Sequence, residues 1–201
     1  MDTLSALAKF KEKVQEFVPL SETEWQALMP LLEVSSLKKK KNFAEPGKIC
    51  NHIALVIKGS IRYFHVKDGE EITGYFSFEN EFASSYKSFL VREPAIHYIQ
   101  TLEDTVFVTL TYAAMQQAYA DNIIGHKMER FARLLAEHYL ICYEDRVTSF
   151  ITQTPEERYN KLLETGGEVL QRIPQHYVAN FLGITPVSLS RIRRRIMKIS
   201  A

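Results

Sequence analysis

The residues best suited to do chemistry lie near the C-terminus, where arginines gather on one face of a predicted helix. Thr185 is a typical helix cap, and Pro186 fits the first helical position, where a missing N–H costs nothing. At about 100° per residue, Leu189, Ile192 and Ile196 share one apolar face. A helix that is buried on one side and basic on the other suits the major groove of DNA. We therefore predict DNA contacts from the cap and the outer face: Thr185, Pro186, Val187, Ser188, Arg191, Arg194 and Arg195.

These arginines predict two kinds of contact. Arg191 is the candidate for a bidentate contact with guanine, whereas Arg194 and Arg195 suit the phosphates, which every DNA sequence presents. A shorter helix is predicted over residues 175–182, and Gly183 can adopt the positive φ of a tight turn. Together these elements predict a helix-turn-helix. The alternative is an ordinary helical hairpin whose arginines are only solvated.

The distribution of charge favours the nucleic-acid interpretation. The chain of 201 residues has a formal net charge of only +1. Residues 165–201, however, contain six basic residues and one acidic residue, so this part carries +5 and residues 1–164 carry −4. A basic module on a mildly acidic body is typical of a protein that touches DNA with one end.

The preceding residues predict a small β-domain framed by helices. Residues 4–32 have a helical pattern, in which Ser21 and Glu24 form a capping box. From residue 37 to residue 110, β-branched and aromatic residues alternate with turn signals, and Asp68-Gly69 is a strong hairpin signal. Short strands at this spacing predict a small barrel or β-roll. The expected fold class is therefore α+β.

A long helix is predicted over residues 122–152. Its apolar positions alternate three and four residues apart, as in a coiled-coil seam. A helix of this length between two modules rarely buries its apolar stripe within one chain, so we expect a homodimer. The alternative is that the stripe packs against its own β-domain. The predicted dimer interface consists of Met128, Phe131, Leu135, His138 and Cys142.

The start of another helix marks a domain boundary. Thr154 is a cap, Pro155 occupies the first position and Glu157 completes a capping box. The sequence therefore predicts three parts. They are a β-roll effector domain at residues 1–120, a long dimerisation helix at 121–153, and a winged-helix-type helix-turn-helix DNA-binding domain at 154–201.

The order of a β-roll, a long helix and a helix-turn-helix resembles the Crp/Fnr family of bacterial transcription regulators. The resemblance covers nearly the whole chain. Its most specific segments are Glu45-Pro46-Gly47, residues 56–62 (VIKGSIR), residues 154–163 and residues 178–193. It implies a homodimeric, sequence-specific regulator of transcription with a cyclic nucleotide-binding-like β-roll, able to contact RNA polymerase.

The resemblance also places an effector pocket after Asn80. Glu81 matches the family's ribose-binding acid, but Asn80 replaces a glycine, and no arginine lies in register near residues 94–96. A cyclic phosphate needs a guanidinium group to offset its desolvation, so we predict that the β-roll does not bind cyclic AMP tightly and leave the effector unidentified. Arg92 is the nearby substitute. The predicted pocket residues are Glu81, Phe82, Ala83, Ser84, Ser85 and Arg92.

Other functional classes find less support in the sequence. None of the six histidines lies in a nucleophile, metal or phosphate-loop motif, so we expect no enzyme. Cys50 and Cys142 are too few for a zinc or iron–sulfur site. The N-terminus lacks the apolar core of a signal peptide and no run could span a membrane, so we expect a cytoplasmic protein. The alternative function is a ligand sensor that acts through protein contacts, with a degenerate DNA-binding module.

Overall fold

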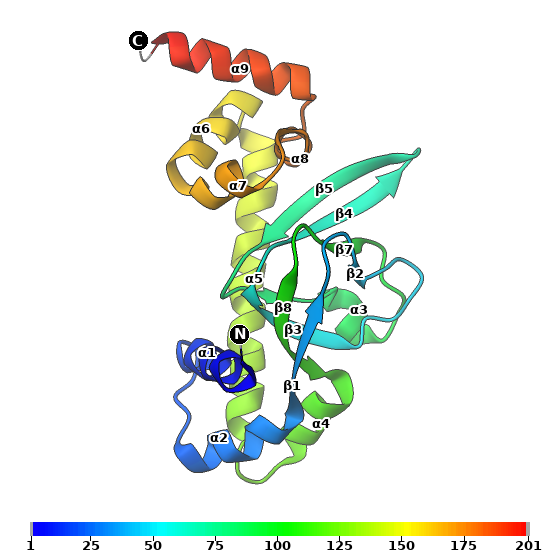
Figure 1. The fold of residues 1–201 in the computed structure, drawn as a ribbon, viewed down its shortest axis with the longest axis vertical. Coiled ribbons are helices and arrows are strands. Elements are labelled where there is room, and N and C mark those ends of the chain that lie inside the picture. The colour runs from blue at the N-terminus through cyan, green and yellow to red at the C-terminus, as the bar shows by residue number, and fades with distance from the viewer. Residues whose placement is uncertain (1, 200–201) are drawn as a thin grey trace.

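The computed structural model describes residues 2–199 and consists of a β-domain flanked by helices, followed by a helical unit (Figure 1). It confirms the α+β class. The elements in chain order are α1 (Thr3–Gln15), α2 (Glu22–Leu28), the 3₁₀-helix η1 (Met29–Leu31), β1 (Leu32–Leu37), β2 (Asn42–Ala44), β3 (His52–Lys58), β4 (Ile61–Lys67), β5 (Glu70–Ser77), β6 (Phe82–Ala83), α3 (Tyr86–Val91), β7 (Tyr98–Thr101), β8 (Thr105–Thr111), α4 (Tyr112–Ala120), α5 (Gly125–Thr152), α6 (Pro155–Thr165), α7 (Gly167–Arg172), α8 (Gln175–Phe181) and α9 (Pro186–Ile199).

Two four-stranded antiparallel sheets form the β-domain, with the orders β1-β8-β3-β6 and β2-β7-β4-β5. Strands β4 and β5 make a hairpin in which Lys67 lies opposite Glu70. The two residues between them, Asp68 and Gly69, have φ angles of 54° and 84°. Positive φ at both positions is what a type I′ turn requires, so the predicted hairpin is confirmed. Its tip projects away from the rest of the β-domain (Figure 1).

The main hydrophobic core lies between the first sheet and helices α1, α2, α4 and α5. Phe82 is 3% exposed in this core, and its ring meets those of Phe10 and Phe131 edge-on at centroid distances of 5.9 and 5.4 Å. The capping box predicted for α2 is present, because the Ser21 N–H donates to Glu24 Oε2 at 2.7 Å and the Glu24 N–H donates to Ser21 Oγ at 3.3 Å. In this half of the molecule, the predicted helix cap is present and the apolar side chains are buried in one core.

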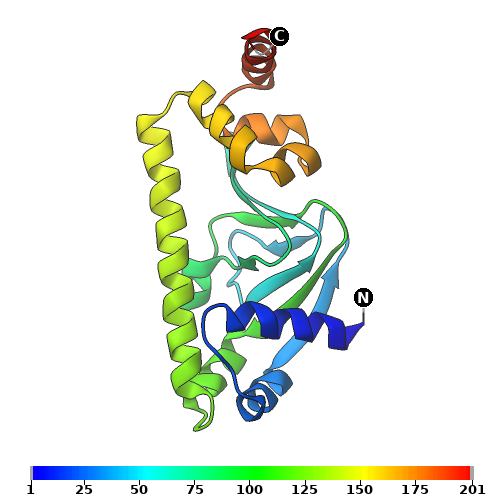
Figure 2. The ribbon, with the colours of Figure 1, turned by 90° about the vertical axis from the view of Figure 1, so that its left-hand side faces the viewer.

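Helix α5 runs along one side of the β-domain (Figure 2) and uses its predicted dimer residues for the chain's own core. Met128, Phe131 and Leu135 are at most 2% exposed there. Cys142 lines a cavity of the same chain, and the His138 ring lies 6.3 Å from that of Phe17. The dimer interface predicted from these five residues is corrected accordingly. Their three-and-four spacing reflects packing on the β-domain, which was the alternative.

Residues 154–199 form helices α6 to α9 around a second core. Thr154 caps α6 as predicted, with the Glu157 N–H 3.3 Å from Thr154 Oγ1. This part of the chain contains no strand, so the wing of the predicted winged-helix type is absent from the described residues. Helix α7 begins at Gly167 and forms the connection between α6 and α8. Helix α9 then continues to Ile199.

Candidate functional site

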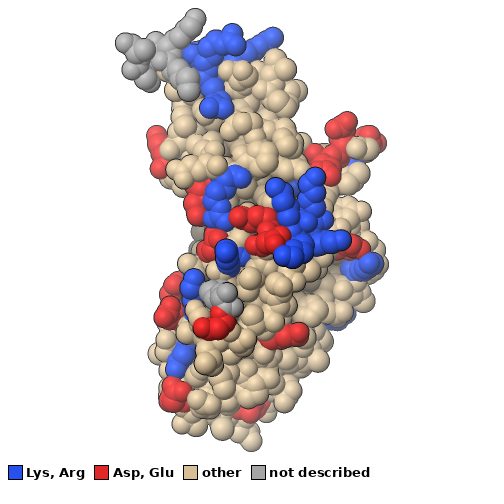
Figure 3. All heavy atoms as spheres, in the orientation of Figure 1, with Lys and Arg blue, Asp and Glu red and all other residues tan. Residues whose placement is uncertain are grey.

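Helix α9 presents an exposed basic face at one end of the molecule. Leu189 and Ile192 are 2% and 7% exposed and pack with α8 in the second core. On the other side of α9, Val187 is 61% exposed, and Arg191 and Arg194 are exposed as well. Figure 3 shows Lys and Arg side chains gathered over this end. The predicted division of α9 into a buried and a basic face is therefore confirmed.

The first turn of α9 is held by its own cap. The Ser188 N–H donates to Thr185 Oγ1 at 3.2 Å, and the two hydroxyl groups lie 3.0 Å apart. These bonds satisfy one of the N–H groups that a helix start leaves unpaired. Ser188 is thus a capping partner on the flank of the helix. Ser190, which the sequence analysis missed, is exposed and lies one turn before Arg194, on the same face.

The four arginines of α9 have different surroundings. Arg195 forms an ion pair with Glu156 of α6 at 2.5 Å, although the Arg195 side chain remains 59% exposed. Arg193 donates to Gln175 Oε1 at 2.7 Å. Among the described residues, Arg191 and Arg194 have no ion-pair partner. These two arginines are therefore the ones that can be offered to an anionic partner without breaking a contact.

Contacts with α5 and α6 hold the turn between α8 and α9 in place. Gly183 has a φ of 73°, as predicted, and an added Cβ would lie 3.0 Å from Phe150 Cε1. Arg158, which is 9% exposed, donates to the Leu182 carbonyl at 2.9 Å and stacks on Phe150 at 4.5 Å. No local sequence pattern indicates this role of Arg158, because its acceptor lies 24 residues away. The turn is consequently anchored to both α5 and α6.

Helix α8 docks on the β4–β5 hairpin. The Asn180 side chain bonds to the backbone of β5, donating to the Glu71 carbonyl at 2.7 Å and accepting from the Thr73 N–H. The rings of Phe76 and Phe181 lie 5.3 Å apart across the same junction. The amide therefore continues the hydrogen bonding of an edge strand, and the hairpin and α8 are joined as one unit.

A buried arginine reinforces this junction. Arg62 is 1% exposed, and its guanidinium lies between the rings of Phe64 and Tyr177, at 4.0 and 3.8 Å. Its charge is balanced by Glu71 at 2.5 Å. Tyr177 belongs to α8, so this cation–π contact crosses from the β-domain to the helical unit. The family motif over residues 56–62 contains Arg62, but the sequence alone did not indicate its partner.

A charged cluster forms a further link between the two units. Arg172 at the end of α7 contacts Glu79 and Glu103 of the β-domain, each at 2.6 Å. Burial opposes ionisation of both carboxyl groups, but hydrogen bonds, including those from Arg172, bring the pKa of each below its usual value. The three side chains are between 27% and 45% exposed, so the cluster is partly screened by water.

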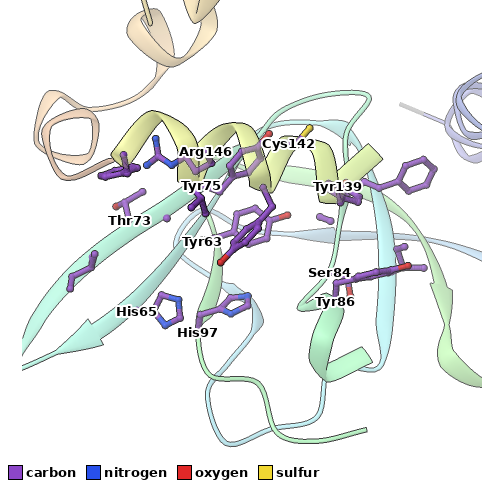
Figure 4. A pocket seen from close by; sticks show the side chains of 18 of the residues that line it. Tyr63, His65, Thr73, Tyr75, Ser84, Tyr86, His97, Tyr139, Cys142 and Arg146 are labelled. Carbon is purple, nitrogen blue, oxygen red and sulfur yellow. The ribbon is translucent and has the colours of Figure 1, made fainter. Parts of the chain in front are cut away.

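A cavity of about 670 Å³ lies between the β-domain and α5. Figure 4 shows Tyr139, Cys142 and Arg146 on α5 at one side of the cavity, with His65 and His97 together on the opposite side. Its lining is mostly apolar and aromatic: Ile53, Tyr63, His65, Ile72, Thr73, Gly74, Tyr75, Phe82, Ala83, Ser84, Tyr86, His97, Tyr139, Cys142, Tyr143, Arg146, Val147, Phe150 and Ile151. Such a volume is in the range of small-molecule sites, roughly 300–1,000 Å³.

The predicted pocket residues divide between this cavity and the surrounding structure. Phe82, Ala83 and Ser84 line the cavity. Ser85 is instead buried at the start of α3. Arg92 is held outside, where it donates to the Cys50 carbonyl at 3.0 Å and to Asn51 and stacks on Tyr112 at 4.2 Å. Arg92 therefore does not substitute for a phosphate-binding arginine, because its left-handed backbone (φ 59°) ends α3 and turns the side chain away.

Glu81 also lies outside the cavity lining. Its carboxylate accepts the Phe78 N–H at 3.2 Å, which fixes the turn before β6. Burial raises the pKa of Glu81 because water no longer stabilises the charged form. In the structure this residue supports the turn and does not contact the cavity, which corrects its predicted place in the pocket.

Two further properties bear on what the site can do. Within residues 2–199, no three His, Cys, Asp or Glu side chains are placed to hold a metal ion. No helix of this part of the chain combines the length and the apolar character needed to cross a membrane.

The fold is shared with solved structures of low sequence identity. The c-di-GMP-responsive global regulator CLP of Xanthomonas campestris is 12% identical, with a TM-score of 0.68 over 90% of this chain and 93% of that chain. A cyclic nucleotide-binding domain from Methylobacillus flagellatus KT is 16% identical, with a TM-score of 0.63 over 70% and 82%. The Thermus thermophilus catabolite activator protein is 17% identical, with a TM-score of 0.56 over 94% and 88%.

No family model and no curated protein sequence matches the chain. At these identities the structural likeness establishes the fold and leaves ligand and partner open. The chain has the fold of cyclic nucleotide-binding domains and, over most of its length, that of the regulator CLP.

Proposed function

We propose that this protein is a homodimeric transcription regulator that binds specific DNA sequences through α9. The observation that carries the proposal is the exposed face of α9. Ser190, Arg191 and Arg194 lie there together, while the opposite face is anchored in the second core. A rigidly held helix with solvent-facing cations can enter the major groove, which admits one α-helix. Helices α8 and α9 with the turn at Gly183 would then act as the helix-turn-helix.

The arginines of α9 are assigned different roles. Arg191 contacts a base edge, since it lies on the exposed face near the N-terminal half of the helix. Arg194 contacts a phosphate and contributes mainly to affinity. Arg195 contacts a neighbouring phosphate, for which it exchanges its ion pair with Glu156.

The exposed stripe on the second half of α5 is proposed as the dimer interface. Leu140, Tyr143, Val147 and Ile151 are 58%, 67%, 38% and 78% exposed and follow one another at spacings of three and four residues; the last three also line the cavity, so the interface would run along the edge of the cavity. Apolar side chains at this spacing form the seam of a two-helix coiled coil. Two α5 helices packed along it would bring two copies of α9 to successive major grooves, about 34 Å apart.

The remaining parts of the proposal concern the effector that the protein binds and the transcription that it controls. The cavity beside α5 holds a small-molecule effector other than cyclic AMP. The dimer acts in the cytoplasm and controls transcription at the DNA sites that it binds. RNA polymerase is its further partner. The cavity and α9 are linked through the docking of α8 on the hairpin.

Selection from a random-sequence duplex library, followed by gel-shift titration of the selected operator, tests the DNA-binding proposal. Arg191→Ala should lose roughly 1–3 kcal/mol of discrimination at one base pair. Arg194→Ala should weaken all sequences about equally and reduce the slope of log K against log salt by about 1. If no sequence is enriched, or if Arg191→Ala selects the same operator equally well, the proposal is wrong. A protein that binds no duplex would favour the sensor that acts through protein contacts.

A further inference from the structure

The cavity beside α5 has a chemical character that identifies the class of molecule it can bind. Its wall contains seven Phe and Tyr rings, supplied by the β4–β5 hairpin, β6, α3 and α5. Aromatic walls bind flat aromatic molecules through stacking and edge-to-face contacts, which add to the gain from burying apolar surface.

The cavity has no cation that is available for an anionic ligand. Arg146 is the single Lys or Arg in its lining. The Arg146 guanidinium donates to the carbonyl of Phe181 and is stacked against the rings of Phe150 and Phe181, at 4.4 and 3.6 Å. Burial lowers the pKa of Arg146 to about 10, because desolvation disfavours the charged guanidinium. A phosphate could recruit this group only by detaching it from α8.

The surroundings also disfavour negative charge. Glu81 is buried close enough to the cavity to raise the pKa values of Tyr63, Tyr75 and Tyr139 electrostatically, in addition to the larger effect of their burial. A phosphate or carboxylate in the cavity would be desolvated without a compensating charge and would lie near this acidic group.

Several polar groups of the wall have no partner within the described residues. The hydroxyl groups of Tyr63 and Tyr139 are already paired, with Ser77 Oγ at 3.2 Å and with the Phe82 carbonyl. The Tyr86 hydroxyl and the His97 ring nitrogens, in contrast, form no hydrogen bond to the protein. Burial, together with the nearby His65, lowers the pKa of His97, so its ring is neutral and can both donate and accept. Figure 4 shows Tyr86 and His97 on different elements around the same space.

We propose that the cavity binds a neutral aromatic molecule that carries a hydrogen-bonding group, such as a phenolic hydroxyl or a ring carbonyl, and excludes anionic nucleotides. The rings of the wall bind the aromatic body, and Tyr86 and His97 bind its polar group. This inference rests on the proposed regulatory function for its biological meaning, but ligand binding itself can be measured without DNA.

Three ligands with the same ring system test the charge preference: 1-naphthol, 1-naphthoate and 1-naphthyl phosphate. Each is titrated against the full-length protein that has been loaded with the neutral fluorescent probe N-phenyl-1-naphthylamine. We expect 1-naphthol to displace the probe at a concentration at least about tenfold lower than either anion, because burying an uncompensated charge costs more than 1.4 kcal/mol. Cyclic AMP and cyclic di-GMP should not displace the probe. Displacement by the anions or nucleotides at lower concentrations than 1-naphthol would overturn the proposal.

Two variants of α5 locate the site. Cys142→Trp places a large side chain in the cavity lining and should weaken probe binding at least about tenfold. Thr148→Trp introduces the same side chain on the same helix at an exposed position outside the lining, so it should bind the probe like the wild type. Circular dichroism shows whether each variant is folded. Equal probe binding by both variants would place the site elsewhere and refute the assignment.

The hydrogen-bonding partners are tested without filling the cavity. His97→Phe keeps an aromatic ring but removes both ring nitrogens, and should weaken 1-naphthol about 2- to 10-fold while leaving naphthalene unchanged. The same loss for both ligands would mean that His97 contributes only shape. Because these measurements contain no DNA, a failure of the DNA-binding proposal leaves their outcome unaffected, and the reverse also holds.

Discussion

One amide side chain supplies two hydrogen bonds between α8 and the β4–β5 hairpin, which makes Asn180→Ala an informative substitution. Asn180 supplies both an acceptor for the Thr73 N–H and a donor for the Glu71 carbonyl. Alanine is a better helix former than asparagine, so the change is not expected to harm α8 itself. What it removes is the pair of hydrogen bonds that joins the helical unit to the β-domain.

The expected loss follows from the burial of the two backbone groups. Thr73 is 3% exposed, so its N–H is left without a partner in the variant, which costs about 1–3 kcal/mol. The Glu71 carbonyl belongs to an exposed residue and can be rehydrated, so its bond contributes about 0.5–1.5 kcal/mol. We therefore expect the junction to lose about 1.5–4.5 kcal/mol, while the contacts of Arg62 and Phe76 with α8 remain in the variant.

Hydrogen exchange followed by mass spectrometry measures this effect at the junction. In Asn180→Ala, a peptide that covers Thr73 should exchange roughly 10- to 1,000-fold faster, since each 1.4 kcal/mol corresponds to a factor of ten. Gln175→Ala is the matched control, because Gln175 lies on α8 and accepts a hydrogen bond from Arg193, without contact to the hairpin. Unchanged exchange at Thr73 in Asn180→Ala would refute the idea that this amide holds the two units together.

Three further predictions concern the turn, the buried carboxyl group and the dimer. Gly183→Ala should lower the free energy of unfolding by about 1–2 kcal/mol, because φ is positive and the new Cβ meets Phe150; urea denaturation with an unchanged midpoint would contradict this. Burial raises the pKa of Glu81, so its cost to stability grows as the pH rises above the unfolded value; Glu81→Gln should stabilise the protein at about pH 8 and give no gain at about pH 4, and a pH-independent gain would exclude this cause. Leu140→Glu should yield monomers in analytical ultracentrifugation, whereas Thr148→Glu should not; a dimeric Leu140→Glu protein would place the interface elsewhere.

The features that sequence analysis predicted well are those that a few neighbouring residues determine. The hairpin at Asp68-Gly69 and the capping box at Thr154 and Glu157 are encoded within four residues, and the structure contains both. Helix α7 was not predicted, because Gly166 and Gly167 are residues typical of a loop. At Gly166 an added Cβ would lie 2.8 Å from the backbone carbonyl oxygen of Leu162, so this glycine allows close packing at the helix junction and does not mark a long flexible connection.

The cavity and the proposed dimer interface could not be predicted because they depend on which elements meet. Tyr63 and Tyr139 come from β4 and α5, His97 directly precedes β7, and no local pattern associates the three. On α5, periodicity predicted an apolar stripe correctly but not what covers it. The stripe of Met128 is buried in the chain's own core, and the stripe of Leu140, roughly 140° around the helix, is the exposed one.

The same residues that enclose the cavity also hold α8, and this sets how an effector could alter DNA binding. Thr73 lines the cavity and bonds to Asn180, and Arg146 lines it and bonds to Phe181. Helices α8 and α9 share one core, so a shift of the hairpin or of Arg146 on ligand binding would move the two helices together. The coupling is reciprocal. A ligand that strengthens operator binding must itself bind more tightly to the DNA complex by the same factor, so titrating 1-naphthol with and without operator measures the coupling free energy directly.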